Sequence, residues 1–215
     1  MTARPVVTSG LDYDPALACR HLSDADPMLG ALIGRVGPCL LRPRRTQSLF
    51  AAVARAIVYQ QLSGSAAATI LGRVQALYAP KRFPTPSDIL ATPPERLRAA
   101  GLSTAKTAAL RDLAERSLDG TVPTMRRVRL MGDEEVIERL VQVRGVGRWT
   151  AEMLLMFRLG RGDVLPVSDL GVRKGFALTF GNRRLPAAIT IERRAERWRP
   201  YRSVACWYLW RALEQ

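Results

Sequence analysis

Metal-binding and disulfide-forming residues are scarce in this chain of 215 residues. It has one histidine, His21, and three cysteines, which lie far apart at Cys19, Cys39 and Cys206. An odd number of widely spaced cysteines provides neither a disulfide framework nor the paired spacing of a zinc site, and a single histidine cannot build one. We therefore expect no metal held by side chains, and we expect His21 to be a core or boundary residue rather than a catalyst.

Long apolar runs and strand patterns are also missing. No run of 18 apolar residues exists, and the first residues, M-T-A-R-P-V-V-T, lack the apolar core of a signal peptide. No convincing alternation of apolar and polar residues exceeds four positions, which argues against β-strands. These absences predict an all-α, intracellular, reduced protein that does not bind membranes.

Negative charge is in short supply relative to positive charge. The chain has 33 lysines and arginines against 19 acidic residues, so its formal net charge is +14 and its pI is about 11.0. Only Lys81, Lys106 and Lys174 are lysines. A proteome rich in Arg codons would explain the choice of arginine but not the excess of positive charge. Because arginine suits phosphates, the excess favours nucleic acid as the partner.

Apolar residues recur at helical spacing between capping residues, Gly and Pro along most of the chain. Residues 1–11 are expected to form an N-terminal tail, and residues 120–129 an irregular basic connector. The expected helices start at Pro15 and Pro27, cover 46–61 and 66–78, follow caps at Ser87 and Thr92, and cover 106–118, 134–143, 149–159, 170–179, 190–198 and 200–213.

A short glycine hairpin lies at the centre of the chain. Gly145, Val146 and Gly147 join two helical patterns, and Arg144 and Arg148 flank them. Glycine at both positions allows positive φ and close approach of another molecule, and the N-terminus of the second helix favours an anion. We interpret the hairpin as a sequence-independent clamp on a phosphate backbone. An ordinary helix–helix turn with a glycine cap is the alternative.

The string V-R-G-V-G-R-W-T-A, followed by the Gly/Pro-bearing loop 160–168 and Asp169, closely resembles the helix-hairpin-helix DNA glycosylase superfamily. Within it the resemblance is greatest to the 3-methyladenine DNA glycosylase II (AlkA-type) branch. Further matching strings lie in the family's order between about residues 45 and 213. They are Y-Q-Q-L-S (59–63), F-P-T-P (83–86), G-L-S-x-x-K (101–106), L-P-V-S-D (165–169) and E-R-W-R-P-Y-R-S (196–203).

The resemblance implies a two-lobed helical fold with a cleft between the lobes. Residues 46–160 would form the central lobe with the hairpin, and residues 12–45 and 161–215 the second lobe. Longer family members carry an extra N-terminal mixed α/β domain, so this chain is expected to be a short form without it.

The implied activity is a monofunctional DNA glycosylase of base excision repair. It would flip alkylated bases (3-methyladenine, 7-methylguanine or a wider range) out of duplex DNA and hydrolyse the glycosidic bond, leaving an abasic site. Asp169 would be the catalytic carboxylate, stabilising the oxocarbenium-like sugar and orienting water. The simpler alternative is that Asp169 only caps a helix. The rival carboxylate Asp163 is interpreted as a loop or capping residue.

Two absences refine this implication. Relatives that also cleave the strand have a lysine where this chain has Trp149, and a tryptophan cannot form a Schiff base, so no lyase activity is expected. Some relatives hold an iron–sulfur cluster on four closely spaced cysteines after the aspartate. Only Cys206 follows Asp169, so no cluster is expected.

The resemblance also implies a pocket for a cationic base, which stacks well on electron-rich aromatic faces. Trp210 and Trp149 match the family's pocket tryptophans. Met153 stands where the best-known relatives have a tyrosine, which indicates a different and wider pocket. Tyr59 is a further wall candidate, whereas Trp207 is more simply a core residue.

Contacts to the DNA backbone are implied for Arg144, Gly145, Gly147, Arg148, Thr150, Lys106 and Arg173. Other arginines, such as Arg193 and Arg194, can equally form a solvated surface. The wedge that fills the vacated duplex is expected at Thr104, which replaces the leucine of long-form relatives, together with Gln60, Gln61 and Leu62. A Na⁺ or K⁺ ion on the hairpin carbonyls of Val143 and Val146 is the one cofactor that the resemblance suggests.

The expected partner is double-stranded DNA that contains alkylated bases, bound by a monomer in the cytoplasm, at the nucleoid if the source is bacterial. Two alternatives stay open: a glycosylase for another lesion class, and a non-enzymatic helix-hairpin-helix DNA-binding protein. A pure binder has no need of Asp169 and its loop, whereas the missing lysine and cluster cysteines weigh against oxidised or mismatched bases.

Overall fold

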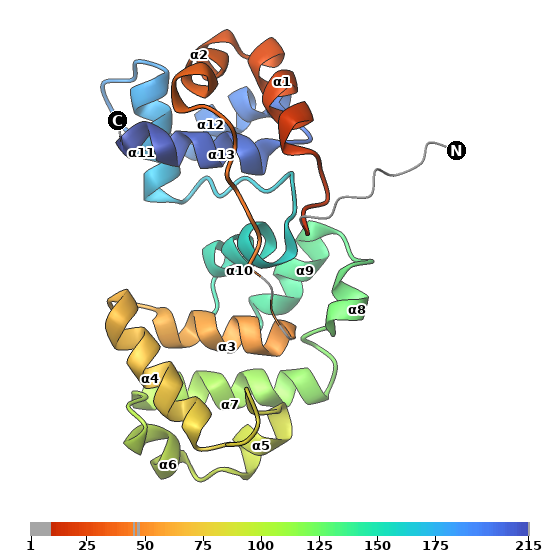
Figure 1. Cartoon of the computed structure of the whole chain (residues 1–215), viewed down its shortest axis with the longest axis vertical. Helices are drawn as coiled ribbons and strands as arrows, with labels where there is room; N and C mark the ends of the chain where they lie inside the picture. Colours follow the sequence, from red (N-terminus) through yellow and green to blue (C-terminus); the bar gives the residue numbers. More distant parts are fainter. Residues whose placement is uncertain (1–9, 45, 47, 215) are drawn as a thin grey trace. The chain divides into compact units, whose positions relative to one another are not determined.

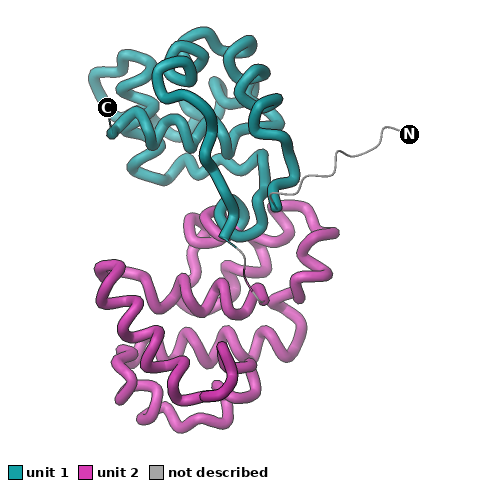
Figure 2. Tube along the Cα trace, in the orientation of Figure 1, with its two compact units in different colours: residues 1–45, 155–215 teal, residues 46–154 magenta. Residues whose placement is uncertain are grey.

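The computed structural model describes residues 10–44, 46 and 48–214. These residues form helices, turns and loops and contain no strand, which confirms the all-α prediction (Figure 1). The chain divides into two compact units, residues 46–154 and residues 1–45 with 155–215 (Figure 2). The division falls at residue 154 rather than 160, inside one continuous helical segment. The cleft stays a prediction.

The unit of residues 46–154 is built around the pairing of α3 with α7, which run side by side in Figure 1. Val53, Ile57, Leu110 and Leu113 are buried and lie at the helical spacing that the sequence shows. Helix α5 packs on α7, and α9 packs on α10. The helices of this unit are α3 (Leu49–Tyr59), α4 (Gly64–Ala76), α5 (Pro86–Ala91), α6 (Pro94–Ala99), α7 (Thr104–Leu118), α8 (Met125–Val128), α9 (Asp133–Leu140) and α10 (Arg148–Leu154).

The other unit packs its first two helices against its last ones, around the fully buried Trp198 and Tyr208. Asp14 and Asp26 cap the first two helices, each with a proline next in sequence, as predicted. A β-carbon at Gly175 would collide with the backbone of Leu209, so glycine is required for the contact of α11 with α13. The elements are α1 (Pro15–Ala25), α2 (Pro27–Val36), a π-helical turn (Leu155–Leu159), α11 (Leu170–Thr179), α12 (Ala188–Ala195), a 3₁₀ turn (Glu196–Trp198), α13 (Arg202–Arg211) and a 3₁₀ turn (Ala212–Glu214).

The predicted N-terminal ends of α3, α4, α5 and α6 were wrong. In the first three, a neighbouring serine or threonine hydroxyl is the N-cap. Ser48 and Ser63 accept hydrogen bonds from the amides of Ala51 and Ala66, so α3 starts at Leu49 and α4 starts at Gly64. Thr85, rather than Ser87, caps α5 in a reciprocal capping box with Asp88. Pro93 takes the N-cap position of α6, and Thr92 instead donates its hydroxyl to the carbonyl of Asp88.

Three other segments differ from prediction. The connector 120–129 contains the short helix α8, which Thr124 caps. Helix α9 ends at Leu140 rather than at residue 143. The predicted helix 149–159 is α-helical to Leu154 and π-helical from Leu155 to Leu159, a conformation often found beside functional sites.

The end of the predicted N-terminal tail is packed. Leu11 is buried, and the amide of Asp12 donates to the carbonyl of Gly160 at 3.2 Å. Residues 1–9 of that prediction lie outside the described residues. His21 is half-buried with its ring edge against Tyr201, centroids 5.3 Å apart, as expected for a boundary residue. Within the part of the chain that the structure describes, no helix is long and apolar enough to cross a membrane.

Candidate active site and nucleic-acid interface

Asp169 is the N-cap of α11, and hydrogen bonds to Oδ1 hold its carboxylate in place. Its Oδ1 atom accepts hydrogen bonds from the amide of Val172 at 2.8 Å and from the indole Nε1 of Trp210 at 2.9 Å. The side chain is only partly buried. The N-cap interpretation is therefore correct, but it is incomplete, because an indole from α13 also orients this carboxylate.

The tryptophan that holds Asp169 is itself held by two residues. Phe157, from the π-helical turn, packs against Trp210 with ring centroids 5.7 Å apart and planes inclined by 31°. A β-carbon at Gly171 would lie 2.7 Å from Cδ1 and 2.8 Å from Nε1 of Trp210, and 3.0 Å from Oδ1 of Asp169. Glycine is thus required for the contact. The sequence assigned Asp169 to catalysis and Trp210 to the base pocket, and the structure brings the two side chains into contact. Sequence reasoning missed Phe157 and Gly171; a glycine two positions after a capping aspartate was the available signal for Gly171.

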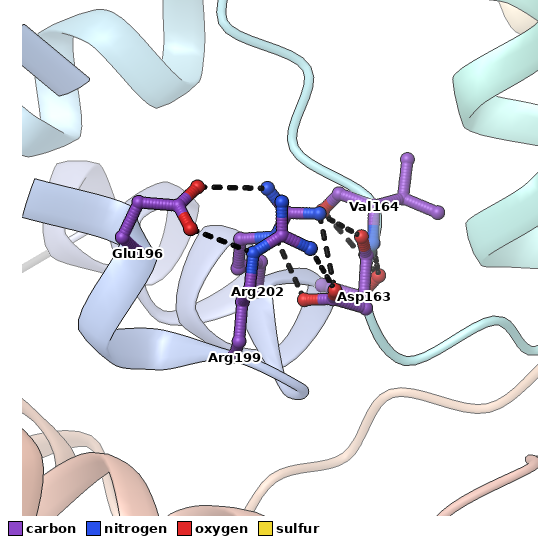
Figure 3. A network of polar contacts seen from close by, with 6 residues as sticks. Asp163, Val164, Glu196, Arg199 and Arg202 are labelled. Atoms are coloured by element: carbon purple, nitrogen blue, oxygen red, sulfur yellow. Dashed lines mark hydrogen bonds and ion pairs between the residues drawn. The ribbon is translucent and has the colours of Figure 1, made fainter. Parts of the chain in front are cut away.

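The loop that carries Asp169 is anchored by an arginine network (Figure 3). Asp163 Oδ2 pairs with Nη1 of Arg199 at 2.7 Å, and its Oδ1 pairs with Nε of Arg202 at 2.7 Å. Arg202 Nη2 also donates to the Asp163 carbonyl at 2.8 Å. Glu196 accepts from Nε of Arg199 at 2.9 Å, which completes the network. Asp163 is fully engaged in anchoring the loop, in agreement with its interpretation as a loop residue.

Hydrogen bonds from Ser203 continue this anchorage into the core. The Ser203 amide donates to the carbonyl of Gly162 at 2.9 Å, and the Val164 amide donates to the Ser203 hydroxyl at 3.0 Å. Ser203 is completely buried. The loop 160–168 is therefore tied at successive residues to the start of α13, the helix that also carries Trp210.

In the hairpin, the two glycines have different roles. Gly145 has φ of +76°, which a residue with a β-carbon adopts only with strain. Gly147 does not have a positive φ, and a β-carbon there would meet no atom within 4 Å. The expectation that glycine provides a positive φ is confirmed at Gly145 and was wrong for Gly147. Among the described residues no atom requires glycine at position 147, so the close approach of a DNA backbone to it stays a prediction.

Side chains from α7 and the end of α3 fix the hairpin through its main chain. Asp112 Oδ2 accepts from the amide of Arg144 at 2.7 Å, and Nε2 of Gln60 donates to the carbonyl of Gly145 at 2.9 Å. Lys106 Nζ donates to the carbonyls of Val58 at 2.7 Å and Gln60 at 2.8 Å. Lys106 therefore binds the C-terminal end of α3 in this structure and not a free surface, and desolvation lowers its pKa.

Comparison with known proteins places this arrangement in a family. Residues 54–200 match the model of the HhH-GPD superfamily base excision DNA repair protein. The chain belongs to this family. The helix-hairpin-helix fold and the resemblance found in the sequence are confirmed.

Relatives of this HhH-GPD protein align over most of its length. DNA-3-methyladenine glycosylase 1 of Schizosaccharomyces pombe is 37% identical over 194 residues, covering 89% of this chain and 84% of that protein. The solved structure of the 3-methyladenine DNA glycosylase Mag1 from the same organism, in complex with abasic DNA, has a TM-score of 0.79 at 36% identity and covers 93% of this chain and 97% of that chain. A DNA-3-methyladenine glycosidase from Bacillus halodurans has a TM-score of 0.83 at 33% identity, covering 91% and 88% of the two chains.

The other predicted backbone contacts of this HhH-GPD protein are mostly occupied by protein groups. Arg148 forms a two-pronged pair with Glu134, both distances 2.7 Å, and its Nε lies 3.1 Å from Glu152 Oε1. Its hydrogen bond with Arg148 lowers the pKa of Glu134. Arg173 donates from Nε and Nη2 to the carbonyl of Pro186, both at 3.2 Å. Both guanidinium groups bind protein groups in this structure, so their phosphate-binding role stays a prediction.

Thr150 and Arg144, two further predicted contacts to the DNA backbone, differ in exposure. Thr150 is buried, so its side chain supports the helix start and does not face solvent. Arg144 is exposed, and within the described ranges its guanidinium has no carboxylate partner. Arg144 is therefore the arginine of the predicted clamp that is most available to a phosphate. The Val143 carbonyl accepts from the Val146 amide at 3.0 Å, and a carbonyl has a second lone pair that fits a monovalent cation.

The aromatic candidates lie in both units. Trp149 is 45% exposed, unusual for such a large apolar ring, and Met153 one turn later is half-buried. Tyr59 is half-buried, with the Arg55 guanidinium 4.1 Å from its ring centroid and Arg55 Nη2 donating to its hydroxyl at 2.6 Å. Arg55 thus covers one face of Tyr59, which sequence reasoning did not foresee.

The wedge candidates lie in two exposed turns. Leu62 is 39% exposed, and its amide donates to the Tyr59 carbonyl at 3.4 Å across a tight turn. Gln61, in the middle of this turn, has φ of +55°, although it is not a glycine. Such strain is common at functional sites. Thr104 is exposed at the first position of α7, which Ser103 caps, while the Gln60 side chain is turned to the hairpin.

Proposed function

We propose that this HhH-GPD protein is a monofunctional DNA glycosylase that removes alkylated bases, first of all 3-methyladenine and 7-methylguanine, from duplex DNA. The names of its relatives support this substrate class, and the complex of a structural neighbour with abasic DNA supports DNA as the partner. The single observation that carries the proposal is the Asp169 carboxylate, oriented by Trp210 at the start of α11. We propose a monomer that acts wherever the genomic DNA lies.

The proposed mechanism uses this orientation. A base methylated on a ring nitrogen is cationic and leaves readily once it is flipped out of the stack, so little acid catalysis is needed. As the bond breaks, the sugar gains positive charge, and a carboxylate held in place stabilises that charge. The same carboxylate then orients and deprotonates the water that attacks the sugar. An abasic site remains.

The absence of lyase activity is part of the proposal. Trp149 occupies the position where strand-cleaving family members resembled by this sequence have a lysine. Lys106 is occupied by the carbonyls of Val58 and Gln60. Without an amine that attacks the sugar, water is the nucleophile. A Na⁺ or K⁺ ion at Val143 and Val146 would add a structural contact to the hairpin and no step to the reaction.

The test is release of 3-methyladenine from methylated duplex DNA by the wild type and by Asp169→Asn. Asparagine caps helices as well as aspartate does, so this variant keeps the fold and removes only the charge. We expect release to fall by about 100-fold or more while DNA affinity stays within a few-fold. Equal release by both proteins would refute the mechanism.

The runner-up functions are separated by the same assay. A wild type that binds duplex DNA but releases no base from methylated, oxidised or mismatched duplexes is a DNA-binding protein. Release from oxidised or mismatched duplexes alone would place it in another lesion class. Either result would contradict the proposal.

A further inference from the structure

A second cluster of arginines surrounds a hollow in the unit formed by residues 1–45 and 155–215. The cavity has a volume of about 390 Å³. Thr190, Arg193, Arg194 and Arg197 line one side of it, at positions i, i+3, i+4 and i+7 of α12 and the 3₁₀ turn that follows. This spacing places the four side chains on one helical face. Phe180, which caps the C-terminal end of α11, is among the residues that line the rest of this arginine pocket.

One of the three arginines is held rigidly. Arg194 Nε and Nη2 donate to the two oxygens of the fully buried Asp26, at 2.7 and 2.8 Å, and Trp198 Nε1 donates to the same carboxylate at 3.0 Å. The Arg194 guanidinium also lies 3.8 Å over the ring of Phe180. Its Nη1 atom has no acceptor among the described residues. Arg194 is therefore more than part of a solvated surface, and its guanidinium offers a pre-oriented donor.

The other two arginines have no counter-charge. Across the described ranges Arg193 of α12 and Arg197 of the following 3₁₀ turn form no ion pair, although both line the same pocket, where like charges repel. Glu196, next to Arg197 in sequence, pairs with Arg199 instead. Arg194 is neutralised by Asp26, so the pocket carries an excess of two positive charges. Convergent unpaired guanidinium groups around a hollow suit a tetrahedral anion, and their planar forks suit phosphate best.

The pocket is separate from the candidate active site. Asp169 caps the start of α11, and Phe180 follows its last residue, eleven positions later. At 1.5 Å per residue, this separation is about 16 Å along the helix, too far for one nucleotide to contact both. A DNA strand, in contrast, carries a phosphate every 3.4 Å along the duplex axis.

We propose that the arginine pocket binds a phosphate of the DNA backbone outside the damaged nucleotide. Arg194 supplies the fixed donor, Arg193 and Arg197 close over the phosphate, and the Thr190 hydroxyl and Asn182 amide complete the set of donors. This contact reads no base, so it adds to the affinity for any sequence. DNA is the source of phosphate because the chain belongs to a DNA repair family.

The test compares the salt dependence of binding to an undamaged duplex for three double variants. Arg193→Gln with Arg197→Gln removes two unpaired, exposed charges and leaves the buried Arg194–Asp26 pair intact. Arg96→Gln with Arg98→Gln, on the exposed face of α6, removes the same charge elsewhere. Arg193→Lys with Arg197→Lys keeps the charge of the pocket and loses only the planar forks.

Each phosphate that the protein neutralises contributes about −0.9 to the slope of log affinity against log salt concentration. We expect the negative slope to become shallower by about 1 in the glutamine variant of the pocket. The slope should change less in the α6 control and stay near the wild-type value in the lysine variant. Equal slopes for the pocket variant and the α6 control would overturn the proposal. Thermal stabilisation by inorganic phosphate or a mononucleotide that the pocket variant loses, with unchanged DNA binding, would also overturn it and assign the pocket to a small ligand. Base release does not enter this test, so its outcome is independent of the proposed glycosylase activity.

Discussion

In residues 46–154 the hairpin is fixed through main-chain atoms, whereas in the other unit the candidate catalytic group is fixed through its own side chain. Gln60 and Asp112 hold the carbonyl of Gly145 and the amide of Arg144. Asp169, in contrast, receives the indole of Trp210 on a carboxylate oxygen. The difference fits the two roles proposed for these groups. A clamp that must accept any sequence needs a rigid backbone, and chemistry at one bond needs one oriented oxygen.

The ion pairs of the two units differ in the same sense. The Asp26 carboxylate is completely buried and receives Arg194, Trp198 and a helix amide. The pair of Glu134 with Arg148 has side chains 59% and 56% exposed. Buried pairs are costly to break, whereas exposed pairs contribute little because water screens them. The unit with Asp169 is therefore expected to depend more on a single polar contact than the hairpin unit does.

The largest expected effect tests this contrast directly. Asp26→Asn leaves the partly exposed guanidinium of Arg194 without its ionic partner and removes a fully buried carboxylate, so the free energy of unfolding should fall by about 3 kcal/mol. Glu134→Gln, the matched exposed change, should cost about 1 kcal/mol or less. Urea unfolding of both variants measures the two values. Similar losses would break the comparison between the units.

The pH dependence of Asp26→Asn sharpens the same point. Burial alone raises the pKa of Asp26, but hydrogen bonds from Arg194 and Trp198 outweigh it and lower the pKa below its usual value of 3.8. A lowered pKa in the folded state means that the carboxylate contributes stability above pH 3.8, and that this contribution is lost as the pH falls through the folded-state value. The gap in stability between wild type and Asp26→Asn should therefore narrow below about pH 4.

The second effect concerns the orientation of Asp169. Gly171→Ala puts a β-carbon against Trp210 and Asp169 Oδ1, so the indole must move and its hydrogen bond is broken. We expect single-turnover base release to fall by about 10- to 100-fold, as for removal of a positioning group. DNA affinity should change little, because the hairpin lies in the other unit.

A matched alanine substitution separates this effect from helix stability. Gly72 also lies within a helix, α4, but a β-carbon there meets no atom within 4 Å. Gly72→Ala should raise the free energy of unfolding by about 0.5–1 kcal/mol and leave base release unchanged. If Gly171→Ala also releases bases at the wild-type rate, orientation of Asp169 by Trp210 is not needed for the reaction.

The third effect separates the roles of the two hairpin glycines in DNA affinity and in stability. Gly147→Ala meets no protein atom and needs no positive φ, so stability should be unchanged, but DNA affinity should fall by about tenfold, or ~1.4 kcal/mol, if a phosphate lies against it. Gly145→Ala should cost about 1–2 kcal/mol of stability because of its φ of +76°. Thermal unfolding and fluorescence anisotropy of DNA binding measure both. A Gly147→Ala protein that binds DNA as wild type does would make the hairpin an ordinary turn.

Local signals in the sequence predicted much of this structure correctly. Asp14 and Asp26 before prolines, and Asp169 before an apolar run, cap helices in the structure as expected, because a cap depends only on the next three or four residues. The resemblance placed Trp210 near Asp169, a contact 41 positions apart that no local rule predicts. The lack of alternation between apolar and polar residues correctly predicted the absence of strands in the part of the chain that the structure describes.

The roles of individual charges could not be predicted in this way. Arg148 follows the hairpin and is therefore expected to bind phosphate. In the structure, however, its Nη1 and Nη2 atoms both donate to the carboxylate of Glu134, 14 positions earlier in the sequence. Lys106 is bound to carbonyls 46 and 48 positions earlier, at the end of α3. A sequence shows where a charge is but not which groups the fold brings to it. For the same reason the sequence does not show that Arg193 and Arg194 line one pocket together with Phe180.

The smallest effect tests the strain at the turn beside the hairpin. Gln61→Gly removes the cost of a positive φ on a residue with a β-carbon, about 1–2 kcal/mol, and adds part of it back as glycine entropy, so a net gain of about 0.5 kcal/mol is expected. If Gln61 also fills the vacated duplex, base release should fall while stability rises, since the turn would be strained for function. Thermal unfolding and single-turnover release measure the two changes, and Gln61→Asn, which tolerates positive φ and keeps an amide, is the control. A gain in stability with unchanged release would show that the strained side chain plays no part in holding the DNA open, and would leave Leu62 and Thr104 as the wedge.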